Sequence, residues 1–130
     1  MLPNISFFNP GCEMEIANGS AFYNLPKYPA LLEHDLAVLP MYFCTNHNDI
    51  VVVDKLPDSN FIDFWKDIFP CTFITKNQIN NLNQRQFNKY LPWGISPRAF
   101  NIIKPIANCF VNNIYNNFDF TNQHNLLFNR

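Results

Sequence analysis

Short runs of apolar residues alternate with longer mixed segments along the chain, and several of these runs predict strands. The clearest are Ile5–Phe8, Ile50–Val53 and Cys71–Thr75. The first ends at an Asn-Pro-Gly sequence (residues 9–11), which is typical of a tight turn. The second is a continuous β-branched run and favours a strand buried on both faces of a parallel sheet. We expect the third to be a buried strand as well.

A helical period precedes the second strand. Pro29 suits the first helical position, and Leu32, Leu36 and Leu39 recur at i, i+4 and i+7. This spacing predicts a helix of about ten residues, with its leucines toward the core and residues 33–35 on the wetter side.

Another helix is predicted between the second and third strands, where Asp58 or Ser59 can serve as the N-cap. Pro70 ends it. Its apolar residues follow the i, i+3, i+4, i+7 pattern and predict a face packed in the core. They are Phe61, Phe64, Trp65 and Ile68.

The segments around these elements are less regular. Residues 12–27 show no clean period, so we expect a long ordered loop, which in a compact domain is usually functional. Pro40 ends or kinks the first helix, Met41–Cys44 is compatible with extended backbone, and residues 45–49 form a polar turn. The polar segment that follows Thr75 is compatible with a helix.

The last predicted element is a helix with Ser96 as its N-cap and Pro97 in its first turn. Pro105 predicts a kink in it. Its apolar positions are Ile102, Ile103, Ile106 and Phe110.

The order of these elements is β-α-β-α-β, followed by a helical segment. Such alternation indicates a small three-layer α/β domain with a mainly parallel sheet and right-handed crossovers. With 130 residues, the chain has room for one domain, which we place at residues 1–117. The tail at 118–130 resembles the start of a further element.

Composition excludes several classes of function. The formal charge of −1 gives no bulk electrostatic case for binding nucleic acid or an anionic membrane. Three glycines, scattered along the chain, form no phosphate-binding loop. There is no signal peptide and no apolar run long enough to span a membrane, so we expect a cytoplasmic protein. The four cysteines lie too far apart in sequence for a zinc or redox motif, and we expect reduced thiols.

Polar residues follow the first strand, at the sheet edge where open α/β sheets bind ligands. Glu13 and Glu15 could accept bonds from an amine or help to hold a metal, and Asn9 and Asn18 could orient a polar ligand. Alternatively, Asn9 makes an Asx turn in a packed loop and both glutamates are solvated. The same segment also includes Pro10 and Gly19.

The segment before the last helix is the second candidate. Trp93 could stack on a ligand or fill the core, with Gly94 permitting the bend. Ser96 begins a helix whose N-terminus favours anions, and Arg98 adds positive charge there unless it is a plain surface residue. The histidines are isolated, and we assign no catalytic or metal-binding residue.

The chain resembles a family of bacterial ATP-grasp-domain proteins over about residues 5 to 100. The motifs that carry this resemblance are Phe8-Asn9-Pro10, Glu13, Glu15, Ala17-Asn18-Gly19, Pro26, Asp35-Leu36-Ala37, Leu39-Pro40, Leu91-Pro92-Trp93-Gly94 and Ser96-Pro97.

The resemblance implies a pre-ATP-grasp domain, an α/β unit that packs against nucleotide-binding lobes and shapes the acceptor-substrate side of a carboxylate-amine ligase site. Residues 9–19 and 93–97 would face that site. The chain ends before an ATP-grasp core, so we expect a truncated or excised, non-catalytic domain that uses no cofactor of its own. ATP and Mg²⁺ would bind only with the missing lobes.

Two further hypotheses remain open. The first is a stand-alone interaction module or homodimer, because 48% hydrophobic residues in so short a chain leave apolar surface that a partner could cover. The second is a small independent enzyme that uses Glu13 or Glu15. The expected partners are thus a second copy or the missing ATP-grasp lobes.

Overall fold

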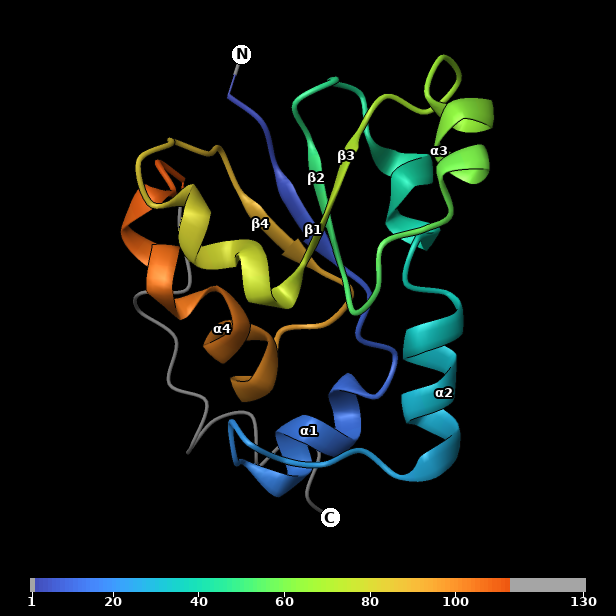
Figure 1. Ribbon diagram of the computed structural model, residues 1–130. Coiled ribbons are helices and arrows are strands. Elements are labelled where there is room, and N and C mark those ends of the chain that lie inside the picture. The colour runs from blue at the N-terminus through green and yellow to red at the C-terminus, as the bar shows by residue number, and fades with distance from the viewer. Residues whose placement is uncertain (1, 113–130) are drawn as a thin grey trace.

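The computed structural model describes residues 2–112 and shows an α/β fold around an all-parallel sheet (Figure 1). Within these residues the sheet has four strands in the order β3-β2-β1-β4. The predicted fold class is therefore confirmed. The strands are β1 (Ile5–Phe7), β2 (Ile50–Val53), β3 (Thr72–Thr75) and β4 (Tyr90–Pro92).

The first strand of the chain occupies the middle of the sheet. Ile5 in β1 pairs with Ile50 on one side and with Tyr90 on the other. All four residues of β2 are buried, as the β-branched run predicts. In β3, by contrast, only Ile74 is buried. This strand lies at the edge of the sheet. The prediction that these residues form a strand is therefore confirmed, whereas the prediction that the strand is buried is wrong.

Helices and 3₁₀ turns connect the strands. The predicted caps are confirmed, since Asp58 begins one helix by accepting from the Asn60 N–H, and Ser96 begins another by accepting from the Ala99 N–H. The α-helices are α1 (Cys12–Asn18), α2 (Lys27–Asp35), α3 (Ser59–Trp65) and α4 (Pro97–Ile103). The 3₁₀ segments are η1 (Leu39–Phe43), η2 (Lys76–Leu82) and η3 (Lys104–Cys109).

The prediction of a long loop at residues 12–27 is wrong, because α1 forms its first part. Glu13 and Glu15 lie in the first turn, where negative charge is favoured by the helix dipole. Gly19 ends the helix with φ 82°, a left-handed conformation that glycine adopts at low cost. A helix this short presents too few apolar positions to show a period.

The predicted orientation of the next helix is also wrong. Helix α2 begins at Lys27, before Pro29, and it buries Glu33 instead of its leucines. Leu32 is 46% exposed, and Leu36 is exposed too. The reason is electrostatic: the Glu33 carboxylate has a cationic partner inside the protein, which turns this face of the helix inward.

The segment after α2 is not extended as expected. Residues 39–43 form η1, with Pro40 in its first turn, and both Pro40 and Met41 are buried. Proline fixes φ near the value that helical turns require, so it begins this turn here after α2 has ended. At the other end of the domain, Pro105 lies in η3, next to a non-helical residue at Ile106, which agrees with the predicted kink.

Each face of the sheet has its own apolar core. The larger core lies between Ile5, Phe7, Ile50 and Val52 and the segments η2, α4 and η3, whereas the smaller one contains Met41, Val51 and Val53. Helix α3 covers the smaller core with Phe61 and Trp65. Its Phe64 is 68% exposed, and Ile68, which follows the end of α3, is exposed as well. The predicted core face is therefore correct for Phe61 and Trp65 and wrong for Phe64 and Ile68.

Helices α1 and α2 lie at the end of the sheet to which the strands run, the lower end in Figure 1. No helix within residues 2–112 is long and apolar enough to cross a membrane. The tail predicted at 118–130, and with it the domain boundary at residue 117, lies outside the described residues.

Candidate functional site: a charged cavity at the carboxyl edge of the sheet

The strand order reverses between β1 and β4, and the loops that follow these strands meet directly. The Asn9 side chain donates to the Gly94 carbonyl at 2.8 Å and accepts from the Gly94 N–H at 2.9 Å. A crevice at such a reversal is the usual ligand site of open α/β sheets. Here the two loops close it by contacting each other.

The close approach of these loops explains Gly94. A Cβ atom at this position would overlap the side chain of Cys12, at the start of α1. Its backbone is not in the left-handed region, since among the described residues only Gly19 has a positive φ. Gly94 is therefore required for space and not for the bend that we expected.

Glu15 lies behind this contact and is fully buried, with 0% exposure. Its carboxylate accepts from the Ser96 hydroxyl at 3.1 Å and from Arg98 Nη1 at 2.7 Å. A buried carboxylate needs such partners to offset its lost hydration. Of the two glutamates predicted as site residues, Glu15 is thus part of a charged cluster, whereas Glu13 is exposed.

Arg98 connects this carboxylate to a second one on α2. Its guanidinium donates to Glu33 Oε1 at 2.7 Å and to Glu33 Oε2 at 2.6 Å. These hydrogen bonds, together with the bond to Glu15, hold the pKa of Arg98 well above its usual range in spite of partial burial. The reading of Arg98 as a plain surface residue is wrong, because it is the central cation of the cluster.

A second cation extends the cluster toward β2. Lys76 Nζ lies 2.6 Å from Asp54 Oδ1 and 3.6 Å from Glu33 Oε2. His34 Nδ1 lies 3.7 Å from the other oxygen of Asp54. Partial burial alone would raise the pKa of Asp54, but the hydrogen bond and charge of Lys76, with the help of His34, lower it below its ordinary value.

The aromatic ring of Phe7, at the carboxyl end of β1, lies against both cations. Lys76 Nζ is 5.1 Å from the ring centroid, and the guanidinium carbon of Arg98 is 5.8 Å from it. Cations at these distances are attracted by the electron-rich face of the ring. The end of the central strand therefore helps to position both positive groups.

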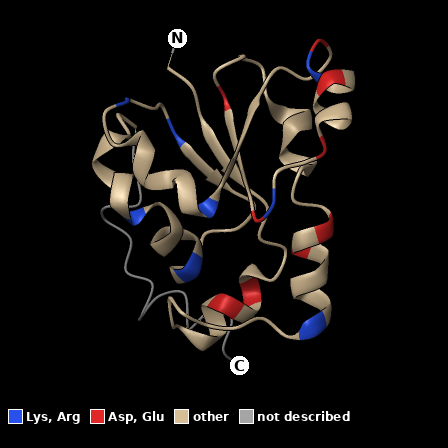
Figure 2. Cartoon of the chain, viewed as in Figure 1, with Lys and Arg blue, Asp and Glu red and all other residues tan. Residues whose placement is uncertain are grey.

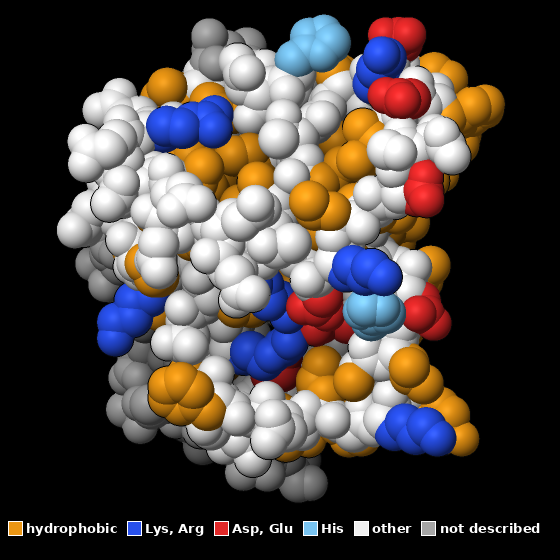
Figure 3. Space-filling view, viewed as in Figure 1, with side chains coloured by type: hydrophobic (Ala, Val, Ile, Leu, Met, Phe, Trp, Pro, Cys, Tyr) orange, Lys and Arg blue, Asp and Glu red, His pale blue; other side chains and the backbone are white. Residues whose placement is uncertain are grey.

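Four charged residues of this cluster line a cavity of about 270 Å³, and they are Glu33, Asp54, Lys76 and Arg98. Asp54 and Lys76 directly follow β2 and β3, so the cavity lies over the carboxyl ends of these strands, beside the closed reversal point. Figure 2 shows acidic residues on α1 and α2 and a basic one at the start of α4 at this end of the molecule, and Figure 3 shows both charges beside a histidine on its surface. The lining residues are Tyr23, Asn24, Leu25, Ala30, Glu33, Asp54, Lys76 and Arg98.

The charges of this cluster do not cancel. Glu15, Glu33 and Asp54 carry three negative charges, and Lys76 and Arg98 carry two positive ones. One negative charge remains while His34 is neutral. The cluster can thus bind a charged group of either sign. A cationic group would bind at Asp54, and an anionic group would bind at the unused N–H groups of Lys76 and Arg98.

The structure brings five of the ten predicted site residues together. The contacts described above link Asn9 to Gly94 and link Glu15 to Ser96 and Arg98, and the Asn9 amide also lies 3.5 Å from the Ser96 hydroxyl. The others take no part in this cluster. Pro10 lies in the turn before α1, Glu13 faces solvent, Asn18 Oδ1 accepts from the Ser20 N–H, and Gly19 ends the helix.

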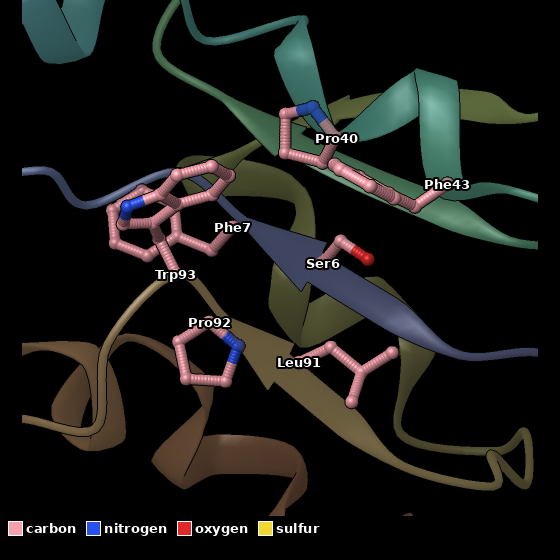
Figure 4. A pocket seen from close by; sticks show the side chains of 7 residues that line it. All are labelled: Ser6, Phe7, Pro40, Phe43, Leu91, Pro92 and Trp93. Carbon is pink, nitrogen blue, oxygen red and sulfur yellow. The ribbon is translucent and has the colours of Figure 1, made fainter.

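Trp93 belongs to a different surface. It is 53% exposed, so it does not fill the core, and its ring packs edge-on against Phe8 at 5.0 Å. It lines an apolar groove of about 340 Å³ across β1 and β4 (Figure 4). The groove is lined by Ser6, Phe7, Pro40, Phe43, Leu91, Pro92 and Trp93.

Sequence reasoning missed three charged residues of the cavity: Glu33, Asp54 and Lys76. Two of them carried a usable signal, because Asp54 directly follows the buried run that forms β2 and Lys76 follows β3. Ligands of open α/β sheets bind at the carboxyl ends of the strands, and this argument, which made Asn9 a candidate, applies equally to Asp54 and Lys76. Glu33 carried no such signal, since the leucine spacing of α2 placed it on the outer face.

No group of three or more potential metal ligands occurs among residues 2–112. The chain matches no known protein family, no curated protein and no solved structure. The chemistry of the cavity is therefore the basis for assigning a function.

Proposed function

We propose that this chain is a non-catalytic, ligand-binding α/β domain that holds a small polar molecule in the charged cavity. In line with the resemblance to pre-ATP-grasp domains, it would form the substrate side of a ligase-like protein whose nucleotide-binding lobes lie elsewhere. The observation that carries the proposal is the cavity of about 270 Å³ in which Arg98 and Lys76 are held in place by buried carboxylates.

The charges favour a ligand that has both an ammonium and a carboxylate group, as an amino acid does. Asp54 is more than a third exposed and can accept a bond from an ammonium group. Arg98 uses three of its five N–H groups within the described part of the chain, and Lys76 also has a donor to spare. The cavity is small, so it suits a ligand of few atoms.

The protonation states favour binding over catalysis. A general base works best when its pKa lies near the operating pH. The pKa of Asp54 is lowered and that of Arg98 is raised, so both groups keep their charge at neutral pH. Stable charges of this kind orient a ligand and transfer no proton to it.

Calorimetric titration with free amino acids tests this function. We expect one or more of glutamate, lysine and alanine to bind, and propionate and ethylamine, which lack one of the two groups, to bind at least about tenfold more weakly. Lys76→Met should weaken binding by a similar factor, and the matched surface variant Lys66→Met should leave it unchanged. Absence of heat with every amino acid would overturn the proposal, as would magnesium-dependent ATP hydrolysis by this chain.

A second candidate function is an interaction module, favoured by the apolar groove. Phe43 is 71% exposed at its rim, and Leu91 and Trp93 are exposed along it. Exposed aromatic side chains around a groove are typical of protein contact surfaces. If a second copy covers the groove, light scattering should show a dimer that Trp93→Asp converts to a monomer. A monomer at all concentrations would exclude the homodimer.

A further inference from the structure

Two of the four cysteines lie side by side at the smaller core. Cys44 ends η1, and Cys71 precedes β3. Both pack, partly buried, against the same buried residues, which are Met41, Val51 and Val53. They are separated by residues 45–70, a segment that includes β2 and α3, so their proximity is a product of the fold and not of their spacing in the sequence.

Asp49 fixes the backbone beside each of these cysteines. Its Oδ2 accepts from the Thr45 N–H at 3.1 Å, and its backbone carbonyl accepts from the Thr72 N–H at 2.8 Å. Thr45 follows Cys44, and Thr72 follows Cys71. Asp49 is itself buried, and its Oδ1 accepts from the Asn4 N–H at 2.9 Å. The two cysteines are therefore held by one anchored residue.

The two thiols interact across this core, and the Cys44 thiol donates a hydrogen bond to the Pro40 carbonyl at 3.6 Å. The interaction with Cys44 lowers the pKa of Cys71. The same interaction, followed by burial, raises the pKa of Cys44. The hydrogen bond to the Pro40 carbonyl needs the proton of Cys44, so Cys71 is the member of the pair that attacks first.

We propose that Cys44 and Cys71 form a dithiol site that reacts with small disulfides of the glutathione class and closes to an intramolecular disulfide. The Cys71 thiolate attacks one sulfur of glutathione disulfide, which forms a mixed disulfide and releases one glutathione thiolate. The Cys44 sulfur then attacks the Cys71 sulfur, and the second glutathione leaves. The two cysteine protons pass to the two glutathione thiolates, so two protein thiols are oxidised as one disulfide is reduced.

The other two cysteines are internal controls, because neither has a thiol partner. The Cys12 side chain lies against Gly94, and its pKa is raised by burial and by the charges of Glu15 and Glu13. The Cys109 thiol contacts the Asn83 carbonyl at 3.7 Å. All four cysteines are free in this structure.

Mass spectrometry after incubation with glutathione disulfide tests the site. The wild-type chain should lose about 2 Da, and digestion should yield one linked peptide pair that contains Cys44 and Cys71. Cys44→Ser should instead retain one glutathione on Cys71. Cys12→Ser and Cys109→Ser should behave as the wild type does. Glutathione adducts without an internal disulfide, or a disulfide that involves Cys12 or Cys109, would overturn the proposal.

A second measurement uses the wild-type chain, so that loss of the dithiol reaction can be distinguished from misfolding of the variants. The disulfide closes the loop that spans residues 45–70, so oxidised wild-type protein should melt at least about 5 °C higher than reduced protein. Reduction by dithiothreitol should reverse this shift. Phenylarsine oxide, which bridges two neighbouring thiols, should bind the native protein with one arsenic per chain and should not bind Cys71→Ser. An unchanged melting temperature together with no arsenic binding would refute the dithiol site.

Discussion

Arg98 and Glu33 are joined by two hydrogen bonds of 2.7 and 2.6 Å, and this pair attaches α2 to the start of α4. The contact spans the cavity and determines which face of α2 is inward. The leucines on the other side of that helix are left in solvent, which is the reverse of what their spacing indicates. The ion pair, and not the spacing of the leucines, thus determines which face of α2 is buried.

The first prediction compares two neighbouring residues of α2. Glu33→Gln should lower the free energy of unfolding by about 3 kcal/mol, because it removes a buried charge and leaves Arg98 and Lys76 short of a partner. Leu32→Gln should change it by less than about 0.5 kcal/mol, since this leucine is exposed. Urea denaturation measures both values. A larger loss for Leu32→Gln would show that the leucine face is inward after all.

The two glutamates of α1 form a second matched pair. Glu15→Gln should lower the free energy of unfolding by about 2 kcal/mol, because Arg98 loses one of its two carboxylates inside the protein. Glu13→Gln, two residues earlier on the exposed face, should be neutral within about 0.5 kcal/mol. Circular dichroism in increasing urea follows both variants. Equal effects would contradict the distinct roles that the structure gives these residues.

Much of the fold was predictable from local signals. Pro97 after a serine cap and the β-branched run in β2 each favour one structure strongly, and both were confirmed. The central charged cluster was only partly predictable. Glu15 and Arg98 were identified as candidates, but their partnership depends on two helices that meet across 83 residues of sequence. No periodicity in either helix specifies that pairing.

Helix α1 and the direction of α2 were missed for a related reason. Periodicity reports where apolar side chains are buried, and α1 buries only Ile16 among its apolar residues, together with the charged Glu15. In α2 the buried residue is again a glutamate. The spacing of apolar residues does not reveal helix faces that are buried by paired charges, because unpaired glutamates are almost always exposed to solvent.

The third prediction concerns the contact between the loops at the strand reversal. Gly94→Ala should lower the free energy of unfolding by about 2 kcal/mol, since the added methyl group overlaps the start of α1 at Cys12. Gly11→Ala should cost less, because its methyl group would meet the movable end of the Leu25 side chain, 2.6 Å from Cδ2. Thermal unfolding ranks the two. The reverse order would mean that the loops can separate easily.

The fourth prediction concerns pH. The pKa of Asp54 in the folded protein is lower than its ordinary value of 3.8, so its ionised form stabilises the fold. This stabilisation is fully present above pH 3.8 and is lost as the pH falls through the lower, folded pKa. The stability difference between wild type and Asp54→Asn should therefore shrink below that pH. Urea titrations from neutral to acidic pH measure it, and a difference that stays constant would contradict the assignment.

The central position of β1 has a consequence for how the chain reaches its native state. Ile5 has two neighbours in the sheet, Ile50 and Tyr90, and both are far from it in sequence. Its pairing with β4 therefore closes the longest loop between paired strands of this sheet, which costs more conformational entropy than the other strand pairings. The pair β2 and β3, whose partners Ile50 and Thr72 are much closer in sequence, can form earlier. We therefore expect β1, in the middle of this sheet, to be the last strand to gain both of its neighbours.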